Sequence, residues 1–137
     1  MRFMMIVKGD KNSEAGVMPS KELVETMTRY NEEMVKAGVM LAGEGLHPTS
    51  RGFKKRIVEG RHTIVDGPFT EAKEIVAGFW LIQVKSRDEA VAWAMRCPAE
   101  IEVRQIHEFE EFPTELQEVA ASEPGTRAEM ERRRNQA

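Results

Sequence analysis

The sequence predicts a single α+β domain in which two helices cover one face of an antiparallel sheet. Two stretches, residues 2–7 and 76–84, are almost continuously apolar, as is typical of strands covered on both faces. Between them, apolar residues recur at three- and four-residue steps over residues 23–37, the period of an amphipathic helix. A chain of 137 residues is long enough to bury one such core.

The first helix has clear signals at both ends. Ser20 is a suitable N-cap, and Glu22 lies where an acidic side chain favours the positive end of the helix dipole. Gly38 then offers the left-handed conformation that commonly ends a helix. The apolar stripe between these signals consists of Leu23, Met27, Tyr30, Met34 and Ala37.

A second strand and a hairpin should follow this helix. Residues 39–46 are predicted as a strand, which its two glycines weaken or mark as a bulge. Residues 53–58 and 62–65 have the composition of two short strands joined by a turn at Glu59-Gly60. The chain then turns through residues 66–69 before the apolar strand at 76–84.

The second helix begins with the spacing of a capping box. In this motif the Ser86 hydroxyl and the Glu89 carboxylate would each accept from the other's backbone amide. Pro98 limits the helix, and residues 101–109 are predicted as the last strand. The resulting order, β-α-β-(hairpin)-β-α-β, is that of a ferredoxin-like domain. We expect this domain to span residues 1–112, and residues 113–137 to form a charged C-terminal tail, loose or partly helical.

Composition argues against several classes of protein. The formal net charge is −3, and no basic stripe of the kind that binds nucleic acid is present in residues 1–112. The sequence has no apolar run long enough for a membrane span and no signal peptide, so a cytoplasmic protein is expected. A single cysteine, Cys97, cannot form an intramolecular disulfide or a multi-cysteine metal site. No phosphate-binding glycine loop or zinc spacing is present, so no cofactor is predicted.

The predicted sheet has a second apolar face that the two helices cannot cover. The first strand is apolar at both parities, with Phe3, Met5 and Val7 on one side and Met4 and Ile6 on the other. Monomers rarely expose a contiguous apolar patch of this kind. Burying several hundred Å² stabilises an assembly by on the order of 10 kcal/mol before association costs. A homodimer is therefore expected.

Three motifs resemble one known family. They are the segment from Gly38 to Leu46 (GVMLAGEGL), the segment from Asp66 to Glu74 (DGPFTEAKE), and the Ala77-Gly78-Phe79-Trp80 strand. Together with the final strand they resemble the YCII-related family, in the branch named for its Asp-Gly-Pro-Phe (DGPF) motif. The resemblance covers roughly residues 1–109.

The resemblance implies a dimeric α/β barrel, in which two ferredoxin-like sheets pack face to face. It also implies a regulatory context, because some members occur beside or fused to extracytoplasmic-function sigma factors. Better-known relatives have a His–Asp pair that is proposed as an active site. In this chain Arg29 and Tyr30 stand in the helix that would bear the histidine, and only the aspartate has a counterpart, at Asp66.

Two acidic residues are the candidates for chemistry. Asp66, followed by Gly-Pro, can hold a turn through its side chain, or it can act as a general base or ligand-binding group. Glu44 lies between two glycines in a predicted strand, where it is either an outward charge on an edge or a group close to a ligand. His47 is either a loop residue or a third member of this site.

Three further residues are candidates for ligand binding. Phe69 is either a core or interface residue or a ring that stacks on a ligand. Trp80 is predicted at the dimer interface, where an aromatic ring would also suit a small-molecule pocket. Arg104 either forms a cross-strand ion pair or binds an anion.

Two functions remain open from the sequence. The first is a homodimeric protein that binds a small organic ligand, and in an enzymatic version uses Asp66 or Glu44 as a base without a metal. The alternative is a non-catalytic regulatory or interaction module that acts with an extracytoplasmic-function sigma factor. The missing helix histidine favours the alternative.

Overall fold

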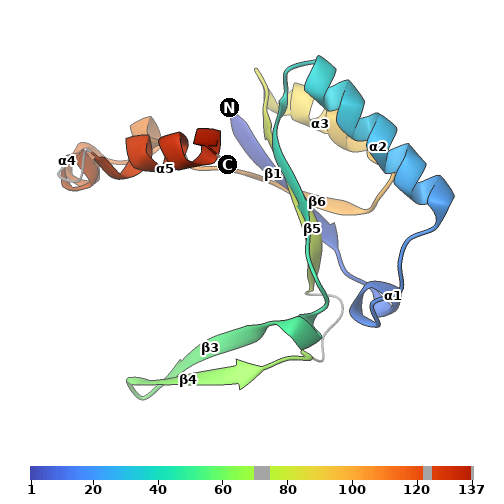
Figure 1. The fold of residues 1–137 in the computed structure, drawn as a ribbon. Coiled ribbons are helices and arrows are strands. Elements are labelled where there is room, and N and C mark those ends of the chain that lie inside the picture. Colours follow the sequence, from blue (N-terminus) through green and yellow to red (C-terminus); the bar gives the residue numbers. More distant parts are fainter. Residues whose placement is uncertain (70–74, 122–124, 137) are drawn as a thin grey trace. The chain divides into compact units, whose positions relative to one another are not determined.

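The computed structural model describes residues 1–69, 75–121 and 125–136. The chain divides into two compact units, Met1–Ile106 and His107–Ala137. The elements of the first unit (Figure 1) are β1 (Arg2–Lys8), α1 (Lys11–Glu14), α2 (Lys21–Lys36), β2 (Met40–Gly45), a 3₁₀ turn (Thr49–Arg51), β3 (Phe53–Val58), β4 (Arg61–Asp66), β5 (Val76–Gln83), α3 (Arg87–Arg96) and β6 (Ile101–Gln105). The second unit contains a 3₁₀ turn (Phe109–Glu111), α4 (Thr114–Ala121) and α5 (Gly125–Gln136). The predicted division at residues 112 and 113 stays a prediction.

Four strands form one antiparallel sheet in the order β2-β5-β1-β6. Helices α2 and α3 lie on the same face of this sheet, and the other face has no helix of the first unit over it (Figure 1). This arrangement confirms the predicted α+β fold with ferredoxin-like strand order. The hairpin β3–β4 forms a separate two-stranded sheet.

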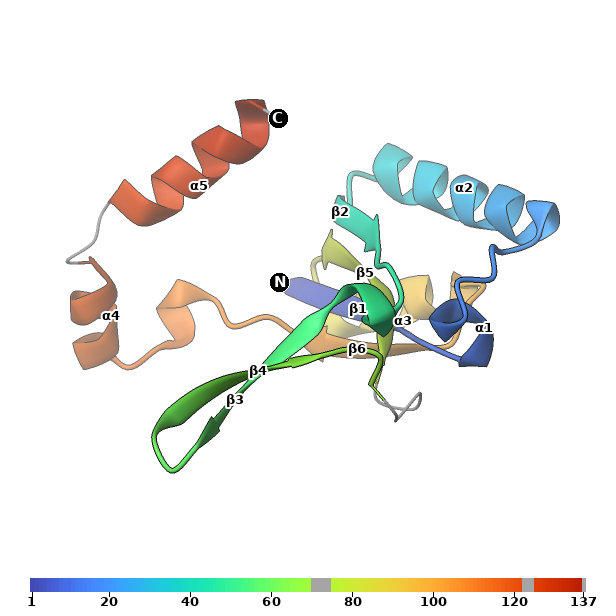
Figure 2. The same ribbon diagram turned by 60° about the horizontal axis from the view of Figure 1, so that its bottom comes forward.

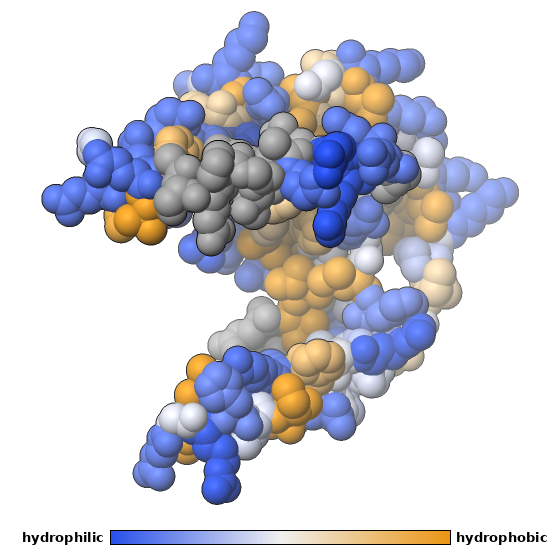
Figure 3. Space-filling view, turned by 60° about the vertical axis from the view of Figure 1, so that its left-hand side comes forward, coloured by the Kyte–Doolittle hydropathy of each residue, from blue (hydrophilic) through white to orange (hydrophobic). Residues whose placement is uncertain are grey.

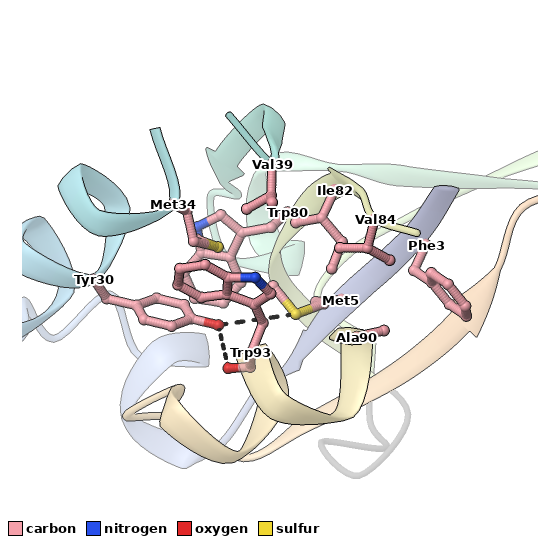
Figure 4. Packing of buried hydrophobic residues seen from close by; sticks show 10 residues of the cluster. All are labelled: Phe3, Met5, Tyr30, Met34, Val39, Trp80, Ile82, Val84, Ala90 and Trp93. Atoms are coloured by element: carbon pink, nitrogen blue, oxygen red, sulfur yellow. Dashed lines mark hydrogen bonds between the residues drawn. The ribbon is translucent and has the colours of Figure 1, made fainter. Parts of the chain in front are cut away.

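The core lies between the sheet and the two helices. Alternate residues of β1 and β5 are buried, so Met5 and Ile82 are fully inaccessible while their neighbours Met4 and Leu81 are half-buried. Burying one such side chain stabilises the fold by roughly 1.5–3 kcal/mol. The cluster, drawn in Figure 4, consists of Phe3, Met5, Tyr30, Met34, Val39, Trp80, Ile82, Val84, Ala90 and Trp93.

Helix α2 follows the predicted signals. The Ser20 hydroxyl accepts from the amide of Leu23, and Gly38 has a φ of +72°, which confirms the predicted cap and stop. The Tyr30 hydroxyl donates to the carbonyl oxygen of Trp93 at 2.7 Å and so ties α2 to α3 (Figure 4). Burial raises the pKa of this phenol, which therefore stays protonated.

Two details of the second half were predicted incorrectly. At α3 the Ser86 hydroxyl accepts from the amide of Glu89, but the Glu89 carboxylate accepts from Lys85 rather than from Ser86. The last strand ends at Gln105 instead of residue 109, because its partner β1 begins at Arg2 and offers no further backbone to pair with. A short helix, α1, which was not predicted, also lies between β1 and α2.

The hairpin turn is formed as predicted. Glu59 and Gly60 have φ values of 51° and 77°, and both lie in the left-handed region that a two-residue hairpin turn of this type requires. Every residue of β3 and β4 is exposed. Figure 2 shows the hairpin as a ribbon that projects away from the four-stranded sheet.

Candidate functional site

The DGPF turn is held against the loop that follows β2. The amide of Phe69 donates to the Thr49 hydroxyl at 2.9 Å. The same hydroxyl donates to one carboxylate oxygen of Glu14 at 2.5 Å, and the amide of Thr49 donates to the other at 3.0 Å. These contacts join α1, the 3₁₀ turn and the DGPF segment. We call the residues involved the loop cluster: Glu14, Thr49, Gly67 and Phe69.

Gly67 is required at its position because of a close backbone approach. A Cβ atom added there would lie 1.7 Å from the carbonyl oxygen of Thr49, far inside van der Waals contact. Its own amide donates to the carbonyl oxygen of Gly52 at 3.0 Å. The glycine of the motif therefore has a packing role that any side chain would disrupt. Residues 70–74 of the motif lie outside the described part of the chain.

Asp66 and Phe69 flank this contact. Asp66 is the last residue of β4 and is exposed, and its carboxylate has no hydrogen-bond partner among the described residues. The Phe69 ring is half-buried, and the Lys54 ammonium lies 4.4 Å from its centroid. Asp66 is thus accessible, whereas Phe69 is partly used in packing and in a cation–π contact.

Glu44 and His47 lie at the same end of the sheet. Glu44 is an exposed residue of β2 that pairs with Phe79, and it lies on the helix-free face because Gly43, its neighbour, pairs with buried Trp80. His47 is exposed, with the Arg51 guanidinium 3.3 and 3.4 Å from its two ring nitrogens. The structure therefore brings Glu44, His47, Asp66 and Phe69 to one end of the sheet.

Arg104 shares the helix-free face with Glu44 but lies at its opposite edge. It is exposed on β6 and pairs with Met4. Strands β5 and β1 separate β6 from β2, so the two edge backbones are roughly 14 Å apart at the usual strand spacing. Within one chain Glu44 and Arg104 are therefore not neighbours. On β6 the neighbouring ion pair joins Glu102 to Lys8 at 3.3 Å.

The expectation that Trp80 lies at a dimer interface is wrong. Its side chain is on the helix side of the sheet, 6% exposed, and its indole nitrogen donates to Asn31 at 2.9 Å. The Tyr30 ring meets it edge to face, with centroids 5.5 Å apart. A Cβ on Gly43 would lie 2.8 Å from the indole, so the glycine leaves room for Trp80. The tryptophan is a core residue on the opposite face from Glu44.

Sequence reasoning missed Glu14 and Thr49. Glu14 lies in a polar stretch between the first predicted strand and the first predicted helix, and Thr49 is one of several polar residues after Pro48. The two residues are 35 positions apart, and no short spacing connects them. The contact becomes visible only when the backbone of α1 and the 3₁₀ turn are placed.

The arrangement offers carboxylates and an imidazole beside an apolar surface. Within residues 1–69, 75–121 and 125–136, no group of three or more His, Cys, Asp or Glu is placed to hold a metal ion. Acid–base chemistry or hydrogen bonding to a polar organic molecule is within the capacity of these groups. Among the same described residues, no helix is long and apolar enough to cross a membrane.

Comparison with known proteins gives three findings. An uncharacterised protein of Rhizobium meliloti is 32% identical over 74 residues, a match that spans 54% of this chain and 60% of that protein. The solved structure of 5-chloro-2-hydroxyhydroquinone dehydrochlorinase from Burkholderia phenoliruptrix, in complex with 2,5-dihydroxybenzoquinone, has a TM-score of 0.44 and 16% identity, covering 79% of this chain and 95% of that one. That similarity is too low to transfer any property of the enzyme. The YCII-related domain model matches residues 1–110, so the chain belongs to the YCII-related domain family.

Proposed function

We propose that the chain is a cytoplasmic homodimer of the DGPF branch that binds a small organic ligand on the helix-free face of its sheet. The observation that carries this proposal is the gathering of Glu44, His47, Asp66 and Phe69, from separate chain segments, at one end of an apolar sheet face. A surface of this composition offers apolar contact area together with a few groups that can orient a ligand.

The dimer is supported by the apolar residues of the helix-free face. Met4 and Ile6 on β1 alternate with the buried core residues, as do Phe79 and Leu81 on β5. These four side chains are half-buried, and they pair across the two central strands. Figure 3 shows an apolar surface on this side of the molecule. A second copy of the same face covers it with matching chemistry.

One orientation of the dimer would bring the charged residues of the two sheet edges together. If the two-fold axis runs parallel to the strands, β2 of one copy lies over β6 of the other. The row of Glu44 ends on β6 at Glu102, which is ion-paired with Lys8, and the row of Arg104 is two residues away, an offset of about 7 Å along the strands. Extended Glu and Arg side chains can close that offset across two sheets. Each site would then contain Glu44 of one copy and Arg104 of the partner subunit.

The chemistry that such a site supports is proton transfer or anion binding. Glu44 or Asp66 would accept a proton from a bound molecule, and Arg104 of the partner subunit or His47 would stabilise developing negative charge. None of these steps requires a metal ion. Turnover of the ligand is the enzymatic form of the proposal.

A second candidate is a non-catalytic regulatory module that acts with a sigma factor. The observation that favours it is Tyr30, which occupies the helix region expected to bear a histidine. Its hydroxyl is committed to the Trp93 carbonyl within the core, and burial raises its pKa. It is thus unsuited to exchange protons with a substrate at neutral pH.

A thermal-shift screen of organic metabolites tests the leading proposal. A ligand at a hundred times its dissociation constant adds about 2.7 kcal/mol of stability, or roughly 5–10 °C for a chain of this size. We expect at least one compound to stabilise the wild type. Glu44→Gln or Asp66→Asn should lower the affinity for that compound at least tenfold. Glu25→Gln, on the exposed side of α2, is the matched control and should retain the full shift.

The two candidates give different outcomes in this screen. A ligand whose stabilisation survives both Glu44→Gln and Asp66→Asn does not bind at the proposed site. A broad metabolite collection without a hit, combined with capture of a purified sigma factor by the wild type, would support the regulatory module instead.

A further inference from the structure

The hairpin β3–β4 pairs with no other strand in the described part of its own chain. Its strands pair only with each other, and all twelve strand positions, six in each strand, are exposed. A two-stranded ribbon alone is marginally stable in water at best. The base of the hairpin is fixed by the loop cluster and by the hydrogen bond from the Gly67 amide to the Gly52 carbonyl oxygen. The side chains along its two strands remain exposed.

The two faces of the hairpin differ in chemistry. Ile57 pairs with His62, Lys55 with Ile64 and Phe53 with Asp66, so these six share one face. Ile64 lies diagonally between Phe53 and Ile57, within the reach of cross-strand neighbours. We call these three residues the arm stripe. Phe53 is 66% exposed, Ile57 is 62% exposed and Ile64 is 60% exposed. The opposite face carries Lys54, Arg56 and Arg61.

The hairpin extends on the helix-free side of the sheet. In Figure 1, α2 and α3 lie to one side of the four strands, and β3–β4 leaves the lower end of the sheet toward the other side. Figure 2 shows the same ribbon reaching clear of the four strands. Any body that covers the helix-free face therefore lies beside the hairpin.

We propose that this hairpin is an arm that grips the second copy of the chain, with the arm stripe packed against the partner subunit. The inference rests on the proposed homodimer and adds a second contact to it. Six residues of strand span about 20 Å, whereas two packed sheets are about 10 Å apart. The arm is thus long enough to pass the partner's sheet.

The area of the sheet face supports this second contact. Four strands of five to eight residues give a flat footprint of roughly 400 Å². A stable interface buries about 800 Å² of accessible surface on each partner, which is about twice the flat area of the sheet face. The exposed arm stripe and the surface beneath it supply the additional apolar area.

Charge also favours a second copy as the occupant. The hairpin from Phe53 to Asp66 has four basic and two acidic side chains, a net charge of +2. The whole chain has −3, so the rest of each copy carries −5. A basic arm is therefore attracted to the acidic body of an identical chain.

The test compares two double variants of the full chain by sedimentation equilibrium. Ile57→Ser with Ile64→Ser removes two of the three apolar side chains of the arm stripe, and Val58→Ser with Val65→Ser removes two apolar side chains from the opposite face, at positions that are 56% and 42% exposed. We expect the first pair to raise the dimer dissociation constant at least tenfold and the second to change it less than threefold.

The outcomes separate the arm from the dimer itself. If the wild type is a dimer and the stripe variant has the same dissociation constant, the arm is overturned while the dimer stands. The same holds if both double variants raise the dissociation constant equally. A monomeric wild type overturns the dimer and the arm together. Should the stripe variant fail to fold, hydrogen exchange of the unaltered chain decides: β3 and β4 amides should exchange at least tenfold more slowly above the dimer dissociation constant than below it. Equal exchange at both concentrations overturns the arm.

Discussion

Gly67 lies directly against the carbonyl oxygen of Thr49, so close that a Cβ on the glycine would be 1.7 Å from that oxygen. Both the Gly67 Cα and the Thr49 carbonyl oxygen belong to the backbone, so neither can move aside as the end of a flexible side chain could. It explains the glycine of the DGPF motif by packing rather than by catalysis. Its neighbour Asp66, in contrast, is exposed and unused by the described fold.

Gly67→Ala should destabilise the chain or displace the DGPF turn. Overpacking of this kind costs about 1–3 kcal/mol, and a backbone clash belongs at the upper end. Chemical denaturation measures the free energy of unfolding. Gly45→Ala is the control, because no atom lies within 4 Å of an added Cβ there, and it should stay within about 0.5 kcal/mol of the wild type. Equal effects of the two substitutions would contradict the close approach.

Thr49→Val should weaken the loop cluster. Valine has nearly the same shape but leaves the Phe69 amide and one Glu14 oxygen without their hydroxyl partner. We expect a loss of about 1–2 kcal/mol in the free energy of unfolding. Thr63→Val, on the exposed β4, removes a hydroxyl without such partners and should be near neutral. A neutral Thr49→Val would mean that the hydroxyl does not hold the turn.

Tyr30→Phe should lower stability at neutral pH and remove a pH dependence at alkaline pH. The substitution removes the bond to the Trp93 carbonyl and should cost about 1–2 kcal/mol. Burial raises the pKa of Tyr30 above its ordinary value of 10.0. The contribution of Tyr30 to the free energy of unfolding is therefore fully present below pH 10. Above pH 10 it decreases by about 1.4 kcal/mol per pH unit, because the Tyr30 phenol ionises there only in the unfolded chain. It is lost as the pH rises through the folded pKa.

This alkaline effect can be measured directly, because Tyr30 is the chain's only tyrosine. Phenolate absorbance of the folded protein should rise at a clearly higher pH than that of the protein in denaturant. The difference in unfolding free energy between wild type and Tyr30→Phe should also shrink above pH 10. Coincident titration of the folded and denatured protein would contradict the buried hydrogen bond.

Leu81→Asp should convert the dimer to a monomer. Leu81 lies between Ala42 and Met4 on the helix-free face, and a carboxylate buried there without a partner costs several kcal/mol. We expect the dimer dissociation constant to rise at least a hundredfold, with the circular dichroism of the fold retained. Val91→Asp, on α3, introduces the same charge on the helix side and should leave the dimer intact. Dimerisation of Leu81→Asp at wild-type strength would exclude this face as the interface.

The parts of the fold that local signals specify were predicted from the sequence. Ser20 and Gly38 gave the ends of α2, and Glu59-Gly60 gave the hairpin turn, because each acts through its own backbone or its nearest neighbours. The contact of Glu14 with Thr49 could not be predicted in this way, since it depends on the placement of two loops 35 positions apart.

The face of Trp80 was the main error, and its cause is physical. Strand β5 is apolar at both parities, so alternation does not tell which side meets the helices. The distinction comes from pairing: Gly43, opposite Trp80, leaves space for the indole on the helix side. Glu44, next along β2, then lies on the other face. Trp80 is thereby separated from Glu44, because the two side chains lie on opposite faces of the sheet.

The mass of the unaltered chain in solution tests the central claim, that a second copy covers the helix-free sheet face. Sedimentation equilibrium at micromolar concentration should give twice the subunit mass of 15.6 kDa. A single species at 15.6 kDa under these conditions would contradict the account, because Met4, Ile6, Phe79 and Leu81 would then remain without the partner proposed for them.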